Sequence, residues 1–446
     1  MIDFTVESEK IDQDTSINEE KLDKSYIPDE FPHREDLQEF LFENILSKII
    51  QEGKTPENAF ITGASGTGKT AVTKASIEKF SEENDDKYLK SIEIVYINCS
   101  TRNSYSKVFE GIADQIGVDW KRGIKNDRNQ ERLFEEMQSS GKTYLIVLDE
   151  LDFLKKRNGR NYIKPVIYDL SRIEEVYSEG LANRFSLLGI SNDFSITSYM
   201  KQFDEDNESG FDPMTRECQP YYAQEISDIL EARYREAFEE DILDKEAITW
   251  LAKKVKDQYE SDIRKGMRVL KNVAKVHQED KNPKEIVKEA HSIYHENRIE
   301  KTIQSCDLHE LIVLSSLTHC MENDMRKLDD IRRTYREICE SFKLEKGNDK
   351  QGAKSKSFVR RRLNKFIKEG LVDRRKNYDE VQNPYVYFSK CDMDLLDEKV
   401  NERLDRKGYS TASQEKYLSE LDDGKTKLGD KALGEEEKSL LDASKK

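Results

Sequence analysis

The sequence predicts an α/β domain, in which helices cover both faces of a parallel sheet, followed by an all-α domain and a winged-helix domain. Three observations support this order. Short apolar runs alternate with helical patterns over residues 25–217, helical patterns alone fill 218–300, and helices give way to a short β pattern within 301–390. Alternating strands and helices are typical of parallel sheets, because crossover helices join parallel strands. We expect residues 1–24 to be disordered and 391–446 to form a charged, disordered tail.

The composition indicates an ample folded core. Of the 446 residues, 36% are hydrophobic. No apolar run approaches the roughly 18 residues that a membrane helix needs, and the N-terminus lacks the basic and apolar regions of a signal peptide. The six cysteines show neither a C-x-x-C pair nor zinc-ligand spacing, which indicates reduced thiols. We therefore expect a cytoplasmic protein that does not contact a membrane.

The distribution of charge matters more than its total. A formal net charge of −16 argues against nucleic-acid binding when taken over the whole chain. Residues 354–376, however, contain ten basic residues and only two acidic ones, Glu369 and Asp373, and so carry a net charge of +8. One concentrated basic face on an acidic protein is the electrostatic footprint of a DNA-binding domain.

A phosphate-loop pattern, G-x-x-x-x-G-K-[ST], lies between an apolar run at 59–62 and a helical pattern from 71. In such a loop successive N–H groups point at one phosphate, Lys69 reaches the β and γ oxygens, and the Thr70 hydroxyl ligates Mg²⁺. A flexible loop is the alternative, but the strand-loop-helix setting favours binding of ATP or ADP with Mg²⁺. The pattern consists of Gly63, Ala64, Ser65, Gly66, Thr67, Gly68, Lys69 and Thr70.

Two carboxylates follow the next strongly apolar run, at 144–148. That run predicts a central parallel strand, whose carboxyl end lies where such sheets bind ligands. We expect Asp149 to hold Mg²⁺ through water and Glu150 to activate the attacking water. A solvated acidic turn is the alternative. The next predicted strand, 185–191, ends at Asn192, whose amide would orient the same water.

The basic segment predicts a DNA-reading helix followed by a β-wing. Ser357 is expected to cap a helix over 358–369, with Gly370 just beyond its end. Strands at 371–378 and 384–388 would form the wing, while the helix enters a major groove. A solvated basic helix face is the alternative. The residues expected to contact double-stranded DNA are Lys356, Arg360, Arg361, Arg362, Lys365, Arg374, Arg375 and Lys376.

Over residues 26–388 the chain resembles the archaeal origin-recognition and cell-division-control type replication initiators, which are AAA+ ATPases with a C-terminal winged helix. The resemblance implies that Asn192 is the sensor-1 residue and that Arg264 is the sensor-2 residue facing the γ-phosphate. It also implies that Tyr221 and Arg233, in the helical lid, contact the nucleotide. The motifs that carry it lie at 32–35, 96–99, 148–152, 167–172, 189–193, 220–223, 229–233 and 261–264.

Two departures from the family pattern bear on activity. The family has a Pro-Arg pair after sensor 1, whose arginine acts on the ATP of a neighbouring copy, but residues 199–205 contain no arginine. Lys201 and Arg216 are the candidates to replace it, although lysine lacks the planar fork of arginine. The wing tip, 377–380, lacks the expected glycines. We therefore expect a slow Mg²⁺-dependent ATPase in which the nucleotide acts as a switch.

The resemblance implies an initiator that binds origin DNA within the nucleoid. It also implies recruitment or loading of a minichromosome-maintenance type helicase and association with other initiator copies. A second interpretation is a DNA-binding regulator, or a plasmid- or virus-type relative, that binds ATP and DNA without loading a helicase. The absent arginine disfavours a third, a processive motor.

Overall fold

A computed structural model describes most of the chain, in two compact units, Met1–Ala290 and His291–Lys446. The described residues are 17–51, 56–84, 89–121, 123, 125–155, 161–171, 173, 184–196, 213–278, 280–323, 325–342, 353–376, 385–389, 391–409, 414 and 418. The segment of the expected trans arginine (199–205) and the wing tip (377–380) lie outside them. The chain passes from the first unit to the second within helix α14 (Pro283–Ser305).

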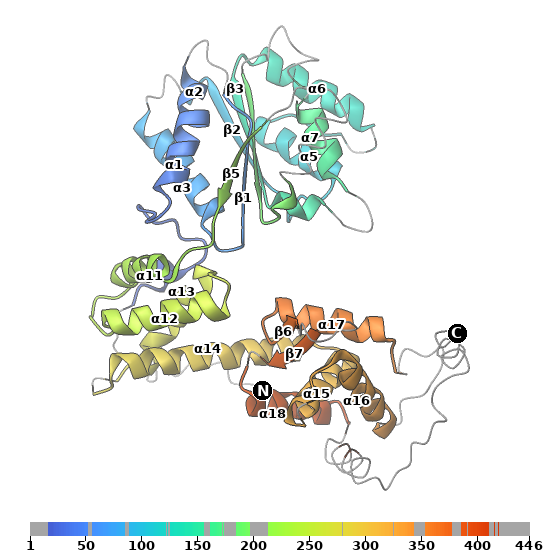
Figure 1. The fold of residues 1–446 in the computed structure, drawn as a ribbon. Helices are drawn as coiled ribbons and strands as arrows, with labels where there is room; N and C mark the ends of the chain where they lie inside the picture. Colours follow the sequence, from blue (N-terminus) through green and yellow to red (C-terminus); the bar gives the residue numbers. More distant parts are fainter. Residues whose placement is uncertain are drawn as a thin grey trace, which may run out of the picture. The chain divides into compact units, whose positions relative to one another are not determined.

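The first unit contains a parallel five-stranded sheet in the order β2-β3-β4-β1-β5 (Figure 1). The central strands are buried almost throughout, as expected of parallel strands covered on both faces. Asn98 lies opposite Asp149 and Thr62 opposite Ser191, so the polar strand ends meet at one edge. The strands are β1 (Ala59–Gly63), β2 (Ile92–Asn98), β3 (Thr143–Asp149), β4 (Phe185–Ser191) and β5 (Met214–Cys218).

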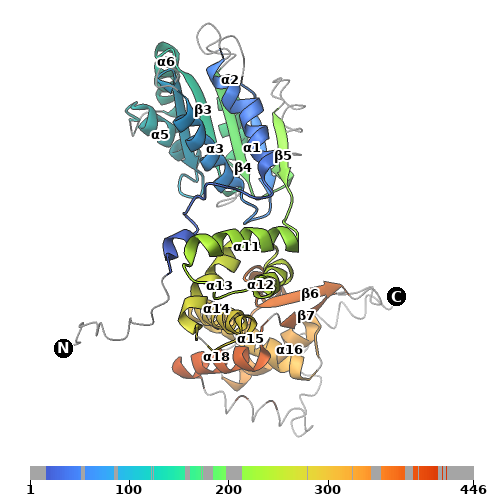
Figure 2. The same ribbon diagram turned by 90° about the vertical axis from the view of Figure 1, so that its left-hand side faces the viewer.

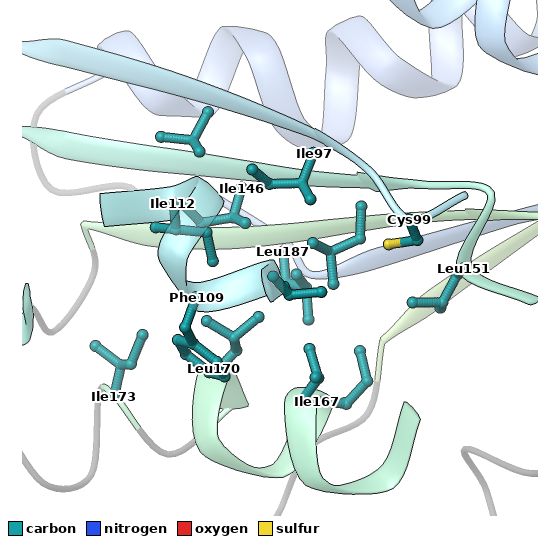
Figure 3. Close-up of a cluster of buried hydrophobic side chains, with 14 of the residues drawn as sticks. Ile97, Cys99, Phe109, Ile112, Ile146, Leu151, Ile167, Leu170, Ile173 and Leu187 are labelled. Atoms are coloured by element: carbon teal, nitrogen blue, oxygen red, sulfur yellow. The ribbon is translucent and has the colours of Figure 1, made fainter. Parts of the chain in front are cut away.

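Helices cover both faces of this sheet, which confirms the predicted α/β fold class (Figure 1). One face packs against α1 (Glu35–Leu41) and α3 (Lys69–Glu83), the other against α5 (Tyr105–Ile116), α6 (Asn126–Ser139) and α7 (Ile163–Ser171). Successive residues of β3 point to opposite faces: Leu145 and Val147 join the first core, Ile146 and Leu148 the second. Figure 3 shows part of the second core.

The helical lid follows β5. It comprises α11 (Ala223–Ala237), α12 (Lys245–Gln258), α13 (Ile263–Val276) and the start of α14. The disorder predicted for 1–24 is wrong from residue 17 on. Ile17 forms a β-bridge with Phe238, and the short 3-10 helix Glu19–Leu22 buries Leu22 against α11 and α13. The charged composition of residues 19–22 did not indicate that Leu22 would be buried.

In the second unit, α14 is followed by α15 (Leu308–Glu322), α16 (Leu328–Ser341) and α17 (Lys356–Lys368), then by an antiparallel hairpin of β6 (Val372–Lys376) and β7 (Tyr385–Ser389). This is the element order of a winged helix. Helix α17 begins earlier than predicted, because Ser355 rather than Ser357 caps it by accepting a hydrogen bond from the Phe358 N–H. Gly370 follows the helix end with a φ of +71°, in the left-handed conformation that favours glycine.

A further helix, α18 (Met393–Arg406), packs against α15 (Figure 2). It lies in the predicted disordered tail, which is therefore wrong for this part. Leu396, Val400 and Leu404 repeat every four residues and are buried, a stripe that the acidic and lysine-rich composition obscured. Residues 419–446 lie outside the described residues. Among the helices that the structure describes, none has the length and apolar character needed to cross a membrane.

Candidate functional site

The phosphate loop joins the end of β1 to the start of α3, and its conformation requires glycine. Gly66 and Gly68 have φ angles of +83° and +87°. A Cβ atom at Gly66 would lie 2.3 Å from Asp262 Oδ1, and one at Gly68 would lie 2.9 Å from the Tyr221 hydroxyl. The loop therefore brings bare backbone to the N-terminus of α3, where N–H groups and the helix dipole favour an anion. This geometry fits a nucleotide phosphate.

Lys69 lies inside this loop. Its side chain is only 5% exposed, and Nζ donates hydrogen bonds to the carbonyl oxygens of Gly63 (2.8 Å) and Ala64 (2.7 Å). Nζ also donates to Asn192 Oδ1 at 3.1 Å, so the end of β4, which neighbours β1 in the sheet, lies beside the phosphate loop. Burial lowers the pKa of Lys69 to about 8.

Asp149, at the end of β3, is 2% exposed and accepts hydrogen bonds from several neighbours. The Thr70 hydroxyl lies 3.1 Å from both carboxylate oxygens, and the Tyr96 hydroxyl donates to Oδ2 at 2.7 Å. Burial raises the pKa of Asp149, while these hydrogen bonds oppose the rise. Hydroxyl and carboxylate oxygens in this arrangement suit Mg²⁺. Tyr96 was not predicted as a residue of the site. It lies on β2 two residues before Asn98, and Asn98 is the strand partner of Asp149.

Glu150 follows in the left-handed conformation, with a φ of +54°. A non-glycine residue pays about 1 kcal/mol or more for this conformation, which is common in binding and catalytic sites. Glu150 lines the same cavity as the phosphate loop, Asp149 and Asn192. The cavity has a volume of about 820 Å³, within the usual range for small-molecule sites.

The lid supplies the remaining predicted residues. Arg264 Nε lies 2.8 Å from Asp262 Oδ1, and Nη2 donates to the Ser65 hydroxyl of the phosphate loop at 2.5 Å. Arg233 pairs with Glu236 at 2.9 Å and places its guanidinium 4.3 Å from the centre of the Tyr26 ring. All the predicted nucleotide-site residues therefore lie in or beside one cavity, lined by the sheet edge, the lid and residues 22–32.

The eight residues predicted to contact DNA divide into two groups. Arg360, Arg361, Arg374, Arg375 and Lys376 are exposed, as is Lys368, which the prediction did not include. The other three predicted residues form ion pairs within the unit.

These inward pairs involve acidic residues of α15 and α16. Arg362 and Lys365 contact Oε1 of Glu310 at 3.1 and 2.8 Å, and Glu310 is only 4% exposed. Lys356 pairs with Asp329. Three of the predicted residues, Lys356, Arg362 and Lys365, therefore form ion pairs that hold α17 against the rest of the unit.

The comparisons with known proteins agree with this fold. The AAA domain family model matches residues 51–189. The ORC1-type DNA replication protein 2 of Thermoplasma acidophilum is 30% identical over 329 residues, which cover 72% of this chain and 77% of that protein. The ORC1-type DNA replication protein of Thermococcus kodakarensis is 28% identical over 338 residues, 74% of this chain and 78% of that protein.

Two solved structures share the fold. The Aeropyrum pernix ORC1 protein in complex with DNA aligns with a TM-score of 0.65 and 24% identity, covering 86% of this chain and 96% of that chain. The Aeropyrum pernix ORC2 protein, solved as ADPNP-ADP complexes, aligns with a TM-score of 0.55 and 20% identity, covering 87% and 98%. The extent of the match to the Thermoplasma protein establishes the family: this chain belongs to the ORC1-type DNA replication proteins.

Proposed function

We propose that this chain is an ATP-switched initiator that binds double-stranded DNA at replication origins. The observation that carries the proposal is the convergence of the phosphate loop, Asp149, Glu150, Asn192 and Arg264 on one cavity. The ORC2 relative was solved with ADPNP and ADP, and the ORC1 relative with DNA, which supports both kinds of ligand.

Each residue of the site has one role in this proposal. The loop N–H groups and Lys69 bind the phosphates, and Thr70 with Asp149 would hold Mg²⁺. The bound ion would neutralise charge at the β and γ oxygens. The Glu150 carboxylate accepts a proton from the attacking water, and the Asn192 amide orients that water. Glu150→Gln should therefore retain ATP binding and lose turnover in a phosphate-release assay. Hydrolysis at the parental rate would refute the role.

The switch depends on the lid. Arg264 already reaches the phosphate loop through Ser65, and a terminal phosphate would offer it a stronger partner than that hydroxyl. Since Arg264 belongs to α13, the position of the lid would depend on whether that phosphate is present. Tyr221 and Arg233 border the nucleotide from the lid side. Hydrolysis is slow and resets the protein.

The second unit binds the DNA. Arg360 and Arg361 face outward from α17 and would enter a major groove, while the exposed arginines of β6 contact the backbone. Recruitment of a minichromosome-maintenance type helicase and association with other initiator copies complete the proposal. Such a protein would be associated with the nucleoid in the cytoplasm.

Mapping where the protein binds its host genome tests this function. Binding concentrated beside replication origins, together with retention of the helicase on origin DNA in a pull-down with purified proteins, is the expected result. Dispersed binding without helicase retention would overturn the initiator proposal and favour a DNA-binding regulator.

A further inference from the structure

We infer that Arg34 is a positioning residue that couples the phosphate loop to the lid, so that a change in the loop reaches α11 and α13. The inference rests on the proposed function, because it assumes that ATP binds at the loop. Arg34 precedes α1 and is 8% exposed, although it is an arginine. A buried guanidinium needs several hydrogen-bond partners, and its partners reveal what it connects.

The guanidinium of Arg34 binds carbonyl oxygens from three segments of the chain. Nε donates to Thr67 O in the phosphate loop at 2.9 Å. Nη2 donates to Gln219 O at 2.8 Å, in the link between β5 and α11, and Nη1 donates to His33 O at 2.7 Å. The planar fork of arginine presents these donors in fixed directions, which the single ammonium group of lysine does not. Arg34 therefore fixes the phosphate loop relative to the start of the lid.

Tyr221 extends this connection into the lid. The Arg34 guanidinium lies 3.7 Å from the centre of the Tyr221 ring, a cation–π contact, and Tyr221 is 3% exposed. Its hydroxyl faces Gly68, and its carbonyl oxygen accepts hydrogen bonds from Ser261 Oγ (3.0 Å) and Lys256 Nζ (3.2 Å). One side chain thus touches the phosphate loop while its main chain is held by the turn between α12 and α13.

The turn between α12 and α13 returns to the phosphate loop. Asp262, next to Ser261, packs against Gly66 and holds Arg264. The contacts therefore form a closed circuit from the loop through Arg34 and Tyr221 to Ser261, and back through Asp262. Two residues of this circuit, His33 and Ser261, have strained backbone conformations, with φ angles of +64° and +61°. A shift of Thr67 on phosphate binding would be transmitted along these rigid contacts.

Arg34→Lys tests this coupling, because it keeps the charge and removes the fork. The readout is hydrogen exchange of a peptide covering residues 255–268, at saturating Mg²⁺-ATP and at saturating ADP. In the parental protein we expect ATP to slow exchange more than ADP does. In Arg34→Lys, calorimetry should show ATP affinity reduced about tenfold, as for the loss of one charge-assisted hydrogen bond. At saturation the difference between ATP and ADP should disappear.

Arg102→Lys is the matched control, since Arg102 is an arginine on the far side of the sheet that pairs with Asp114 at 2.9 Å. It should behave like the parental protein. If Arg34→Lys does not fold, Tyr221→Leu decides, because it removes the stacked ring and leaves Arg34 in place. A retained difference between ATP and ADP in either folded variant would overturn the coupling. Failure of the parental protein to bind ATP would instead overturn the proposed function.

Discussion

The phosphate loop and the basic segment are both dense clusters in the sequence, yet they use their residues differently. In the phosphate loop the groups proposed to bind phosphate are backbone N–H groups and a buried lysine, Lys69, held by carbonyl oxygens. In the basic segment the groups proposed to bind DNA are side chains, and Glu310 contacts two of the predicted ones inside the unit. The spacing of a motif therefore predicts each residue of the loop. A count of basic residues predicts a charged segment, but not which of its side chains face the solvent.

Lys69→Ala should have the largest effect, because it removes the one cation inside the loop. We expect ATP affinity to fall at least about 100-fold, the loss of several charge-assisted contacts, when measured by calorimetry. The matched control is Lys79→Ala on the same helix, where Lys79 is exposed and pairs with Glu83 at 3.8 Å. Unchanged affinity in Lys69→Ala, or an equal loss in Lys79→Ala, would contradict the assignment of the loop.

The outward group of the basic segment should give the next largest effect. Replacing Arg360, Arg361 and Lys368 with alanine should weaken duplex DNA binding. It should also lower the slope of log affinity against log salt by about 2 to 3, since each phosphate contact contributes roughly 0.9. Fluorescence anisotropy over a salt series measures both quantities. An unchanged slope would mean that α17 does not face DNA.

The inward group provides the contrast. Arg362→Gln with Lys365→Gln removes two positive charges from the same helix, one fewer than the outward variant, and takes them from side chains that contact Glu310. We expect a smaller change in salt slope for each charge removed, and a larger loss of thermal stability, than in the outward variant. Equal effects on DNA binding would show that the structural division of the basic residues has no functional meaning.

The same contrast explains what could be predicted from the sequence. The phosphate loop, Asp149 and Glu150 could be predicted because each follows an apolar strand within a few residues. Asn192 was predicted only as the end of the next strand, and the structure places its amide beside Lys69. The contacts of Arg34 and Tyr96 were not predictable, because their partners lie 185 and 53 residues away in the chain.

Composition misled at both ends of the fold. Residues 19–22 and 393–406 are mostly charged, and a few apolar side chains were enough to anchor them. The prediction for the basic segment was incomplete for a different reason. The packing of α17 against α15 and α16 determines which of its faces points outward. The sequence pattern of α17 alone does not predict that Glu310 lies beside it.

Glu310→Gln tests how much the inward ion pairs contribute to the stability of the second unit. It removes the carboxylate that Arg362 and Lys365 share, although Arg362 keeps Asp307 at 3.6 Å, and both of these side chains keep about a third of their surface in water. Solvent screening should therefore limit the loss to about 1–2 kcal/mol of unfolding free energy, below the value for a fully buried pair. Denaturant unfolding measures it. DNA affinity should be unchanged or higher, since the unit loses one negative charge, and a marked loss of affinity with full stability would contradict this interpretation.

Tyr96→Phe should give the smallest effect, because it changes a single hydrogen bond within the buried site. It removes one hydrogen bond to Asp149 Oδ2 and leaves the ring, Thr70 and the Glu150 N–H in place. Losing one such bond costs about 1 kcal/mol, so the Mg²⁺ concentration that half-saturates ATP binding should rise about fivefold, while Mg²⁺-free binding stays the same. Tyr144→Phe is the matched control, because Tyr144 also lies on the sheet and its hydroxyl contacts Ser140 at 2.9 Å, away from the loop. If both variants shift the Mg²⁺ dependence equally, Tyr96 contributes to packing rather than to the orientation of Asp149.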